Sequence, residues 1–231
     1  MSEGLPDLPS VFTPIIALRE VGDAMARAVA EAPRHGAGTL VWARSWSRIE
    51  AAVVLEPEQT LAAARPALLA AMVAFADAVA PYGPSELPLT FDWPGGIRVN
   101  GGLVGRACLA APPGCAEDAV PDWLVAGIEV AFAAPVEDEP GRDPGRTTLF
   151  EEGFNDTTPT DLTAGWARHL MANLADWQGG GFRVLAERYL ARLDPALGEG
   201  AQRGLDPATG DLLLRRGGAT ERHPIAGALV A

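Results

Sequence analysis

The 231-residue chain contains 18 arginines and no lysine. This absence excludes Schiff-base chemistry at a lysine, a Walker-type phosphate-binding lysine, and a prosthetic group attached to this chain through a lysine amide. An alanine-, glycine- and arginine-rich composition also points to a GC-rich coding sequence as the cause. Whatever its origin, the absence narrows the chemistry open to this protein.

Metal-binding and disulfide patterns are absent as well. The three histidines lie far apart, and Cys108 and Cys115 lack the spacing of a CxxC pair. We therefore expect no metal site and two free thiols. No basic start followed by an apolar stretch marks a secretory signal, and the longest strongly apolar run, between Arg65 and Asp77, is shorter than the roughly 20 residues of a membrane span. These features predict a cytoplasmic protein.

Positive charge is scarce, and the formal net charge is −12. Nucleic acids and anionic membranes attract basic surfaces, so this balance argues against both partners. A small anionic ligand stays compatible with the sequence if arginines gather locally. Hydrophobic residues make up 48% of the chain, enough for one substantial domain with a small appendage.

Hydrophobic periodicity predicts both helices and strands. Apolar residues recur at spacings of three and four residues from Ala17 onward, which predicts a helix that ends before Pro33. Runs of β-branched and aromatic residues predict strands. Further helices are expected at 68–79, 166–177 and 182–193, and strands at 38–42, 49–56, 87–93, 97–99, 103–109 and 122–133. The acidic, Pro/Gly-rich stretch 135–148 predicts a mobile surface loop, and 203–218 predicts a strand, turn, strand and further turn.

The stretch 91–106, FDWPGGIRVNGGLVGR, carries the most informative spacing. Trp93-Pro94-Gly95-Gly96 precedes a tight-turn signal at Asn100-Gly101, and Gly102 and Gly105 follow it. This order resembles the biotin/lipoate protein ligase family, whose members carry a WPND-type sequence, a hairpin turn, a lysine and then a glycine. The resemblance spans roughly residues 37 to 228.

Later segments are similar to the same family in the same order. DWLVAGIEV resembles a strand that usually ends Gly-Ile-Asn, with Glu129 in place of the asparagine. LMANLADWQGGGFRVLAERYLARL is similar to the two closing helices, and GLDPATGDLLLR to the short β domain of biotin ligases. The resemblance implies an α+β fold: a mixed sheet flanked by helices, like class II synthetases, over 1–194, and a small C-terminal β domain over 195–231. At under about 40 residues, that second segment should depend on contact with the first.

The resemblance also implies a chemistry. Family members activate biotin or lipoate as an acyl-adenylate and pass it to a lysine of a carrier protein, while related transferases move octanoyl groups. ATP, a small carboxylic acid or acyl ligand, and a biotinyl or lipoyl carrier domain are therefore implied as partners.

Several family residues are missing, however. The lysine falls at Gly102 or Leu103, the Asp at Gly96, and the Arg/Gly-rich loop is shortened to ARSWSR, 43–48. An early Ser/Thr-Thr-Asn segment is replaced by REVGDAM. Losing one hydrogen-bond donor to the charge that develops in a transition state raises the reaction barrier by about 3 kcal/mol. These losses together therefore predict that standard adenylation is absent.

Three hypotheses follow. The first is a ligase-like protein that keeps a pocket for a carboxylic acid, acyl group or acyl-nucleotide without standard activity. The second is an active ligase or acyltransferase whose rearranged site uses Arg106 or Cys108. The third is a non-catalytic protein that docks biotinyl or lipoyl carriers.

Candidate ligand-binding residues follow from the resemblance and from side-chain chemistry. Arginines can pair with a carboxylate or phosphate, and tryptophans can wall an apolar pocket. The predicted set is Arg44, Trp46, Trp93, Gly95, Gly101, Gly102, Gly105 and Arg106. Cys108 is a candidate nucleophile only if a neighbour lowers its pKa, since cysteine is more often a small buried hydrophobe. Arg98 is expected in solvent and Trp42 in ordinary packing, and no catalytic residue is assigned.

Overall fold

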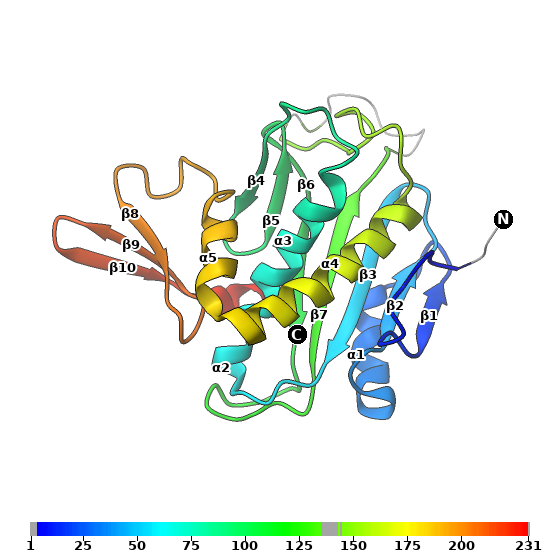
Figure 1. Ribbon diagram of the computed structural model, residues 1–231, viewed down its shortest axis with the longest axis horizontal. Helices are drawn as coiled ribbons and strands as arrows, with labels where there is room; N and C mark the ends of the chain where they lie inside the picture. Colours follow the sequence, from blue (N-terminus) through cyan, green and yellow to red (C-terminus); the bar gives the residue numbers. More distant parts are fainter. Residues whose placement is uncertain (1–3, 135–142, 144, 231) are drawn as a thin grey trace.

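The structure, a computed structural model, describes residues 4–134, 143 and 145–230. Its main sheet has seven strands in the order β1-β2-β3-β7-β6-β5-β4 (Figure 1). β1 is parallel to β2, and every other neighbouring pair is antiparallel. The strands are β1 Ile15–Leu18, β2 Leu40–Ala43, β3 Arg48–Leu55, β4 Leu89–Asp92, β5 Gly96–Val99, β6 Gly102–Ala110 and β7 Leu124–Ala131.

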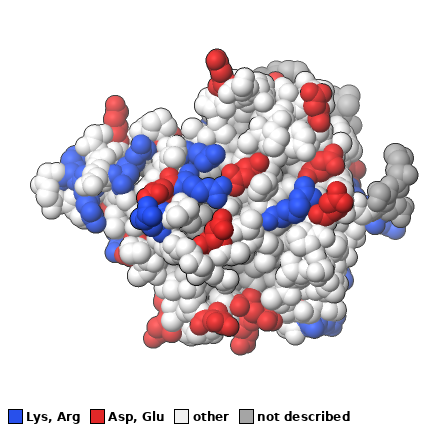
Figure 2. Space-filling view, in the orientation of Figure 1, with Lys and Arg blue, Asp and Glu red and all other residues white. Residues whose placement is uncertain are grey.

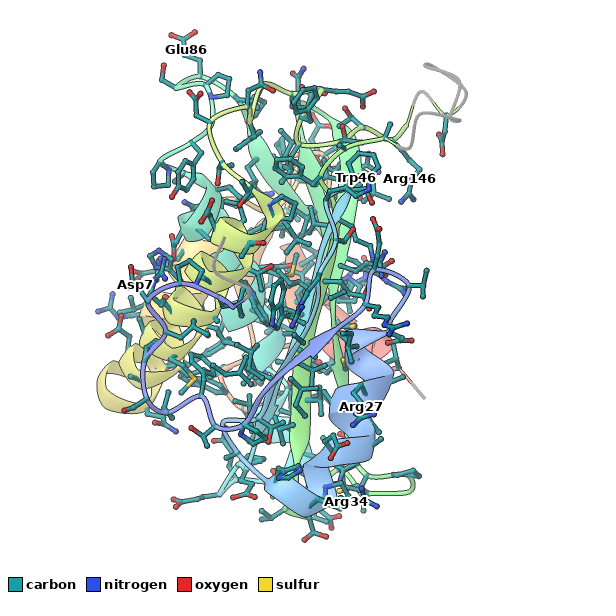
Figure 3. All side chains as sticks on the ribbon, turned by 90° about the vertical axis from the view of Figure 1, so that its right-hand side faces the viewer. Asp7, Arg27, Arg34, Trp46, Glu86 and Arg146 are labelled. Carbon is teal, nitrogen blue, oxygen red and sulfur yellow. The ribbon has the colours of Figure 1, made fainter. Side chains whose placement is uncertain are left out.

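Helices cover the two faces of this sheet unequally (Figures 1 and 3). One face packs against α3, α4 and α5, and this layer holds the larger core, in which Trp166, Phe75 and Tyr189 are fully buried. The other face carries α1, which packs on a smaller cluster and leaves part of the sheet uncovered. The helices are α1 Ala24–His35, α2 Leu61–Ala64, α3 Ala67–Val79, α4 Pro159–Gly180 and α5 Phe182–Leu190.

The predicted helix from Ala17 to before Pro33 is wrong at both ends. Ile15–Leu18 forms the edge strand β1, and α1 begins only at Ala24, where the Asp23 carboxylate accepts a hydrogen bond from the backbone N–H of Ala26 at 2.8 Å. Pro33 lies inside the last turn of α1. A proline there removes one intrahelical hydrogen bond near an end that frays anyway, so the helix continues past it.

The other predicted elements are confirmed, with small shifts of their bounds except for the helix predicted at 166–177, which begins seven residues earlier as α4, Pro159–Gly180. Asn100 and Gly101 both have positive φ, 51° and 81°, as a tight hairpin turn requires. Arg98 differs from the prediction: the register of β5 shifts beside it, and its guanidinium donates to the Asp92 carboxylate at 2.7 Å and is half-buried. Residues 135–142 and 144 of the predicted loop lie outside the described residues.

A second, three-stranded sheet follows α5, with β8 Gln202–Leu205, β9 Leu212–Arg216 and β10 Ala219–His223. Leu212, Leu214 and Ile225 belong to the same core cluster as the main sheet. After the short 3-10 helix Ile225–Ala228, the N–H of Val230 donates to the carbonyl of Leu109 on β6 at 2.8 Å. The C-terminal segment therefore packs into the main domain, and its standing as a separate domain stays a prediction.

One helical stretch, Leu61–Val79, is long and apolar enough to cross a membrane, but 83% of its most apolar window is buried inside the protein, as in a core helix. On the helical face, arginine and acidic side chains are interspersed, with acidic groups along the lower edge (Figure 2). The cytoplasmic location stays a prediction.

Candidate functional site

Two adjoining cavities lie on the α1 side of the main sheet. The helix cavity, about 730 Å³, is lined by α1 and by β3, β6 and β7, and the hairpin cavity, about 760 Å³, by β6, β7 and the Trp93–Gly96 corner. Both volumes fall in the range of small-molecule sites. We call the two together the groove, because they share Arg48, Arg106, Cys108, Glu129 and Val230 in their linings.

The groove floor is set by strand register. Glu50 on β3 lies opposite Glu129 on β7, which lies opposite Arg106 on β6. One row along, Gly127 lies opposite Ala52 and Cys108. Alternate residues of a strand share a face, so both rows face the α1 side of the sheet while their neighbours enter the main core. The groove is lined there by Glu50, Arg106, Cys108, Gly127 and Glu129.

The start of α1 is fixed by two floor residues of β3. Glu50 accepts a hydrogen bond from the N–H of Ala24 at 2.6 Å, and its second oxygen accepts from Nε of Arg48 at 2.6 Å. Arg48 also donates to the carbonyl of Gly22 at 3.0 Å. A carboxylate at a helix N-terminus satisfies an orphan donor and the helix dipole. Arg48 and Glu50 are thus held by the protein itself.

The opposite wall is the Trp93–Pro94 corner, held from below by α5. Tyr189 is fully buried, and its hydroxyl donates to the carbonyl of Pro94 at 3.3 Å. Its ring stacks on Phe91 and meets Trp93 edge-on, with centroids 5.2 and 6.0 Å apart. Burial raises the pKa of Tyr189, so it acts here as a neutral donor.

Glycines allow close backbone approach beside the groove. A Cβ on Gly95 would lie 2.5 Å from the carbonyl oxygen of Ala107, and a Cβ on Gly105 would lie 2.2 Å from that of Glu129. The N–H of Ala107 in turn donates to the carbonyl of Gly95 at 2.8 Å. Both glycines are therefore explained by packing between strands, whatever the ligand.

Cys108 sits in an environment that favours the neutral thiol. Burial raises its pKa from 9.0 to about 11, and of the charged neighbours only Arg106 opposes the rise, whereas Glu129, Asp23 and Glu50 add to it. A nucleophilic cysteine needs the reverse balance. The groove therefore does not provide the activation that a Cys108 nucleophile requires.

The structure brings together part of the predicted ligand-binding set. Trp93, Gly95, Gly105, Arg106 and Cys108 line the groove. The residues outside both linings are Arg44, Trp46, Gly101 and Gly102. Arg44 is exposed, as is Trp46 at 55%, and Gly101 forms the hairpin tip. Trp42 is buried, as expected.

Other lining residues were not selected from the sequence. Arg48 and Glu50 alternate with buried residues along an otherwise apolar strand, and this alternation was the available signal. For Asp23 the available sequence signal was weaker, that of a residue that caps a helix. For Arg146, inside a Pro/Gly-rich stretch, no pattern in the sequence indicated a place in the groove. Among residues 4–134, 143 and 145–230, no group of three or more His, Cys, Asp or Glu is placed to bind a metal ion.

Comparisons with known proteins agree on one family. The model of the biotin/lipoate A/B protein ligase family matches residues 8–191. No curated protein sequence matches the chain. A biotin protein ligase-like protein of unknown function from Silicibacter sp. TM1040 is 26% identical, with a TM-score of 0.82 over 97% of this chain and 99% of that one.

Solved biotin ligases share the fold at lower identity. The apo biotin protein ligase of Aquifex aeolicus is 17% identical, with a TM-score of 0.69 over 90% of this chain and 94% of that one. The Leishmania major biotin protein ligase in complex with biotin is 18% identical, with a TM-score of 0.58 over 90% and 97%. The predicted mixed sheet flanked by helices, with a small C-terminal sheet, is confirmed by this likeness.

Proposed function

The chain belongs to the biotin/lipoate A/B protein ligase family, and we propose that its groove binds a small carboxylic acid, an acyl group or an acyl-nucleotide without standard adenylating activity. The observation that carries the proposal is the groove itself: two adjoining cavities, one beside α1 and one at the Trp93–Pro94 corner, whose linings combine apolar surface with charged side chains. An acyl chain and a charged head group need that combination.

The apolar side chains of the helix cavity suit a ring or an acyl chain. Met25 and Val29 of α1 face Trp123 and Ala110 across the helix cavity. Gly127 provides the floor, where a Cβ would lie only 2.9 Å from the sulfur of Met25. A ligand that buries apolar surface here gains roughly 25 cal/mol for each Å² removed from water.

The hairpin cavity differs from what adenylation by this family requires. The two positions predicted for the lysine are occupied by Gly102 and Leu103, and the chain has no lysine to place elsewhere. Arg106 lines the cavity, but a planar guanidinium does not reproduce the reach of a compact ammonium. ATP would supply an adenylyl group if bound, and the arginines of this cavity fit its phosphates by charge. They support binding of the nucleotide more than its reaction.

Thermal denaturation with a ligand panel tests the binding proposal. The panel contains biotin, lipoate, octanoate, ATP and a non-hydrolysable acyl-adenylate. A ligand at 100 times its Kd stabilises the folded state by about 2.7 kcal/mol, a readily measured shift in Tm. We expect the acyl-adenylate to exceed ATP or any acid alone. If none of the acyl compounds shifts the Tm, the proposed function is wrong.

Acid-dependent exchange of labelled pyrophosphate into ATP tests the loss of adenylation. We expect no exchange above the rate without protein. Robust exchange would instead support the second hypothesis, an active enzyme with a rearranged site. Arg106 is the residue to replace in that case, since it lines both cavities and the Cys108 thiol is not activated. Recovery of biotinyl or lipoyl carriers in a pull-down, without ligand binding, would favour the docking hypothesis.

A further inference from the structure

A third arginine reaches the hairpin cavity from outside the strands of the sheet. Arg48 and Arg106 project from β3 and β6, whereas Arg146 belongs to the segment that follows β7. In Figure 3, Arg146 lies on the α1 side of the sheet, at the end that α1 does not cover. The sequence predicts only a surface loop here.

Backbone pairing fixes this arginine beside β6. The N–H of Leu103 donates to the carbonyl of Gly145 at 2.9 Å, and the N–H of Thr147 donates to the carbonyl of Leu103 at 3.2 Å. Together they form a parallel bridge that sets Arg146 opposite Leu103, and both residues line the hairpin cavity. Next along the chain, the Thr148 N–H donates to the Glu151 carboxylate at 3.1 Å, so the segment is anchored on that side too.

The same segment closes the place where a lysine side chain was expected. A Cβ on Gly102 would lie 2.6 Å from Cγ2 of Thr147. The other expected position, Leu103, is apolar. The cation beside positions 102 and 103 therefore comes from the neighbouring segment, whereas β6 supplies its own cation, Arg106, further along the strand.

Two of the three arginines are available to a ligand. Arg48 is already bound by Glu50 and by the carbonyl of Gly22. Arg106 lies 3.7 Å from the Glu129 carboxylate, beyond hydrogen-bond length, and its side chain is 64% exposed. Arg146 is exposed as well. A guanidinium binds phosphate through paired hydrogen bonds, and a phosphate carries more charge than the one carboxylate that competes for Arg106.

From this geometry, and resting on the proposed function of the groove, we propose that Arg146 and Arg106 form a binding site for a phosphate or pyrophosphate group. The ligand class is thus an acyl-nucleotide or another phosphorylated acyl compound, with its phosphate at the hairpin cavity. Arg146 supplies the cation that positions 102 and 103 of β6 lack.

Calorimetric titration with inorganic pyrophosphate and with ATP, at one fixed ionic strength, tests the site. Arg146→Ala should weaken the binding of both probes by about tenfold or more, the size of one lost charge-assisted hydrogen-bond pair. Arg146→Lys should fall between Arg146→Ala and the wild type. Arg34→Ala is the matched control: it removes the same charge from an exposed residue at the far end of α1 (Figure 3), so binding should change by less than about twofold.

The outcomes separate this site from the proposed function. The site is overturned if wild-type protein binds neither probe, or if Arg146→Ala and Arg34→Ala weaken binding equally. The proposed function depends on a different measurement, the rise in Tm that an acyl compound produces. Pyrophosphate binding that requires Arg146, with no shift by any acyl compound, would support the anion site and refute the acyl ligand. If the protein binds the acyl-adenylate and Arg146→Ala leaves that binding unchanged, the acyl ligand would be supported and the anion site refuted.

Discussion

The reactivity of Cys108 tests the electrostatics of the groove. A thiol reacts with a disulfide reagent as its thiolate, so a pKa of about 11 in place of 9.0 makes the reactive form about 100-fold scarcer near pH 8. A more basic thiolate is also more nucleophilic. With a Brønsted coefficient of roughly 0.4–0.5, each thiolate reacts just under tenfold faster, which offsets part of that loss. The net expectation is a reaction about ten times slower than that of an ordinary thiol, before any loss of access.

The assay uses a Cys115→Ser variant, so that Cys108 is the single reporter. Release of thiopyridone from dithiodipyridine is followed between pH 7 and 10.5, with urea-unfolded protein as the reference thiol. Limited access scales the rate at every pH equally, whereas a raised pKa moves the whole profile to higher pH. In folded protein the rate should therefore still be rising at pH 10, where the unfolded thiol has begun to level off.

Two further replacements should act in opposite directions. Glu129→Gln removes a charge that raises the pKa of Cys108, and Arg106→Ala removes the charge that lowers it. The reaction near pH 8 should become faster in the first variant and slower in the second. A folded-state profile that levels off at or below about pH 8.5 would refute this reasoning, because the site would then stabilise the thiolate. That result would restore Cys108 as a candidate nucleophile.

Three other predictions concern stability and are checked by urea unfolding or hydrogen exchange. Gly105→Ala should lower the free energy of unfolding by about 2 kcal/mol or more, because its Cβ would lie 2.2 Å from the carbonyl oxygen of Glu129; an unchanged urea midpoint would contradict this. Glu50→Ala should lower the free energy of unfolding by about 1–3 kcal/mol, because the N–H of Ala24 at the start of α1 loses its acceptor. Glu50→Gln, which keeps an acceptor, should lower it by less. Burial alone would raise the pKa of Asp211, but hydrogen bonds from a backbone amide and from Arg222 outweigh it and lower the pKa. With a lowered pKa, the Asp211 carboxylate stabilises the fold at pH values above its unfolded-state pKa, and this stabilisation is lost as pH falls through the folded-state pKa. The protection factors of β9 amides, which correct for the slower intrinsic exchange in acid, should therefore fall over that range, and Asp211→Asn should remove this dependence.

The hairpin that joins β5 to β6 beside the site could be predicted from sequence because its signals are local. Asn100-Gly101 specifies a turn with positive φ at both residues, and the flanking residues are typical of strands. The register shift beside Arg98 could not be predicted, because it depends on how β5 meets β6. The partner of Arg98 lies on the other side of β5: Asp92 on β4 is its diagonal neighbour, accepts its hydrogen bond and withdraws it from solvent.

The start of the chain was misread because two short elements share one apolar pattern. Ala17 and Leu18 fit a helical period with the residues of α1, but they belong to an edge strand that pairs with β2. Only that pairing distinguishes them. Arg146 was missed for a related reason: its place in the groove depends on a bridge to Leu103, more than 40 positions earlier in the chain. Long-range pairing leaves no local mark in a sequence.

The charges of the groove also restrict how the proposed ligand could lie. Glu50 and Glu129 sit opposite each other on neighbouring strands, an arrangement that is unfavourable for like charges. Glu50 is compensated by Arg48 and the start of α1, whereas among the described residues Glu129 has the loose contact with Arg106 alone. An anionic group placed over this pair would be repelled. The acyl part would therefore occupy the helix cavity, and the negative head would pass beyond Glu129 to the hairpin cavity, where Arg106 and Arg146 can both reach it.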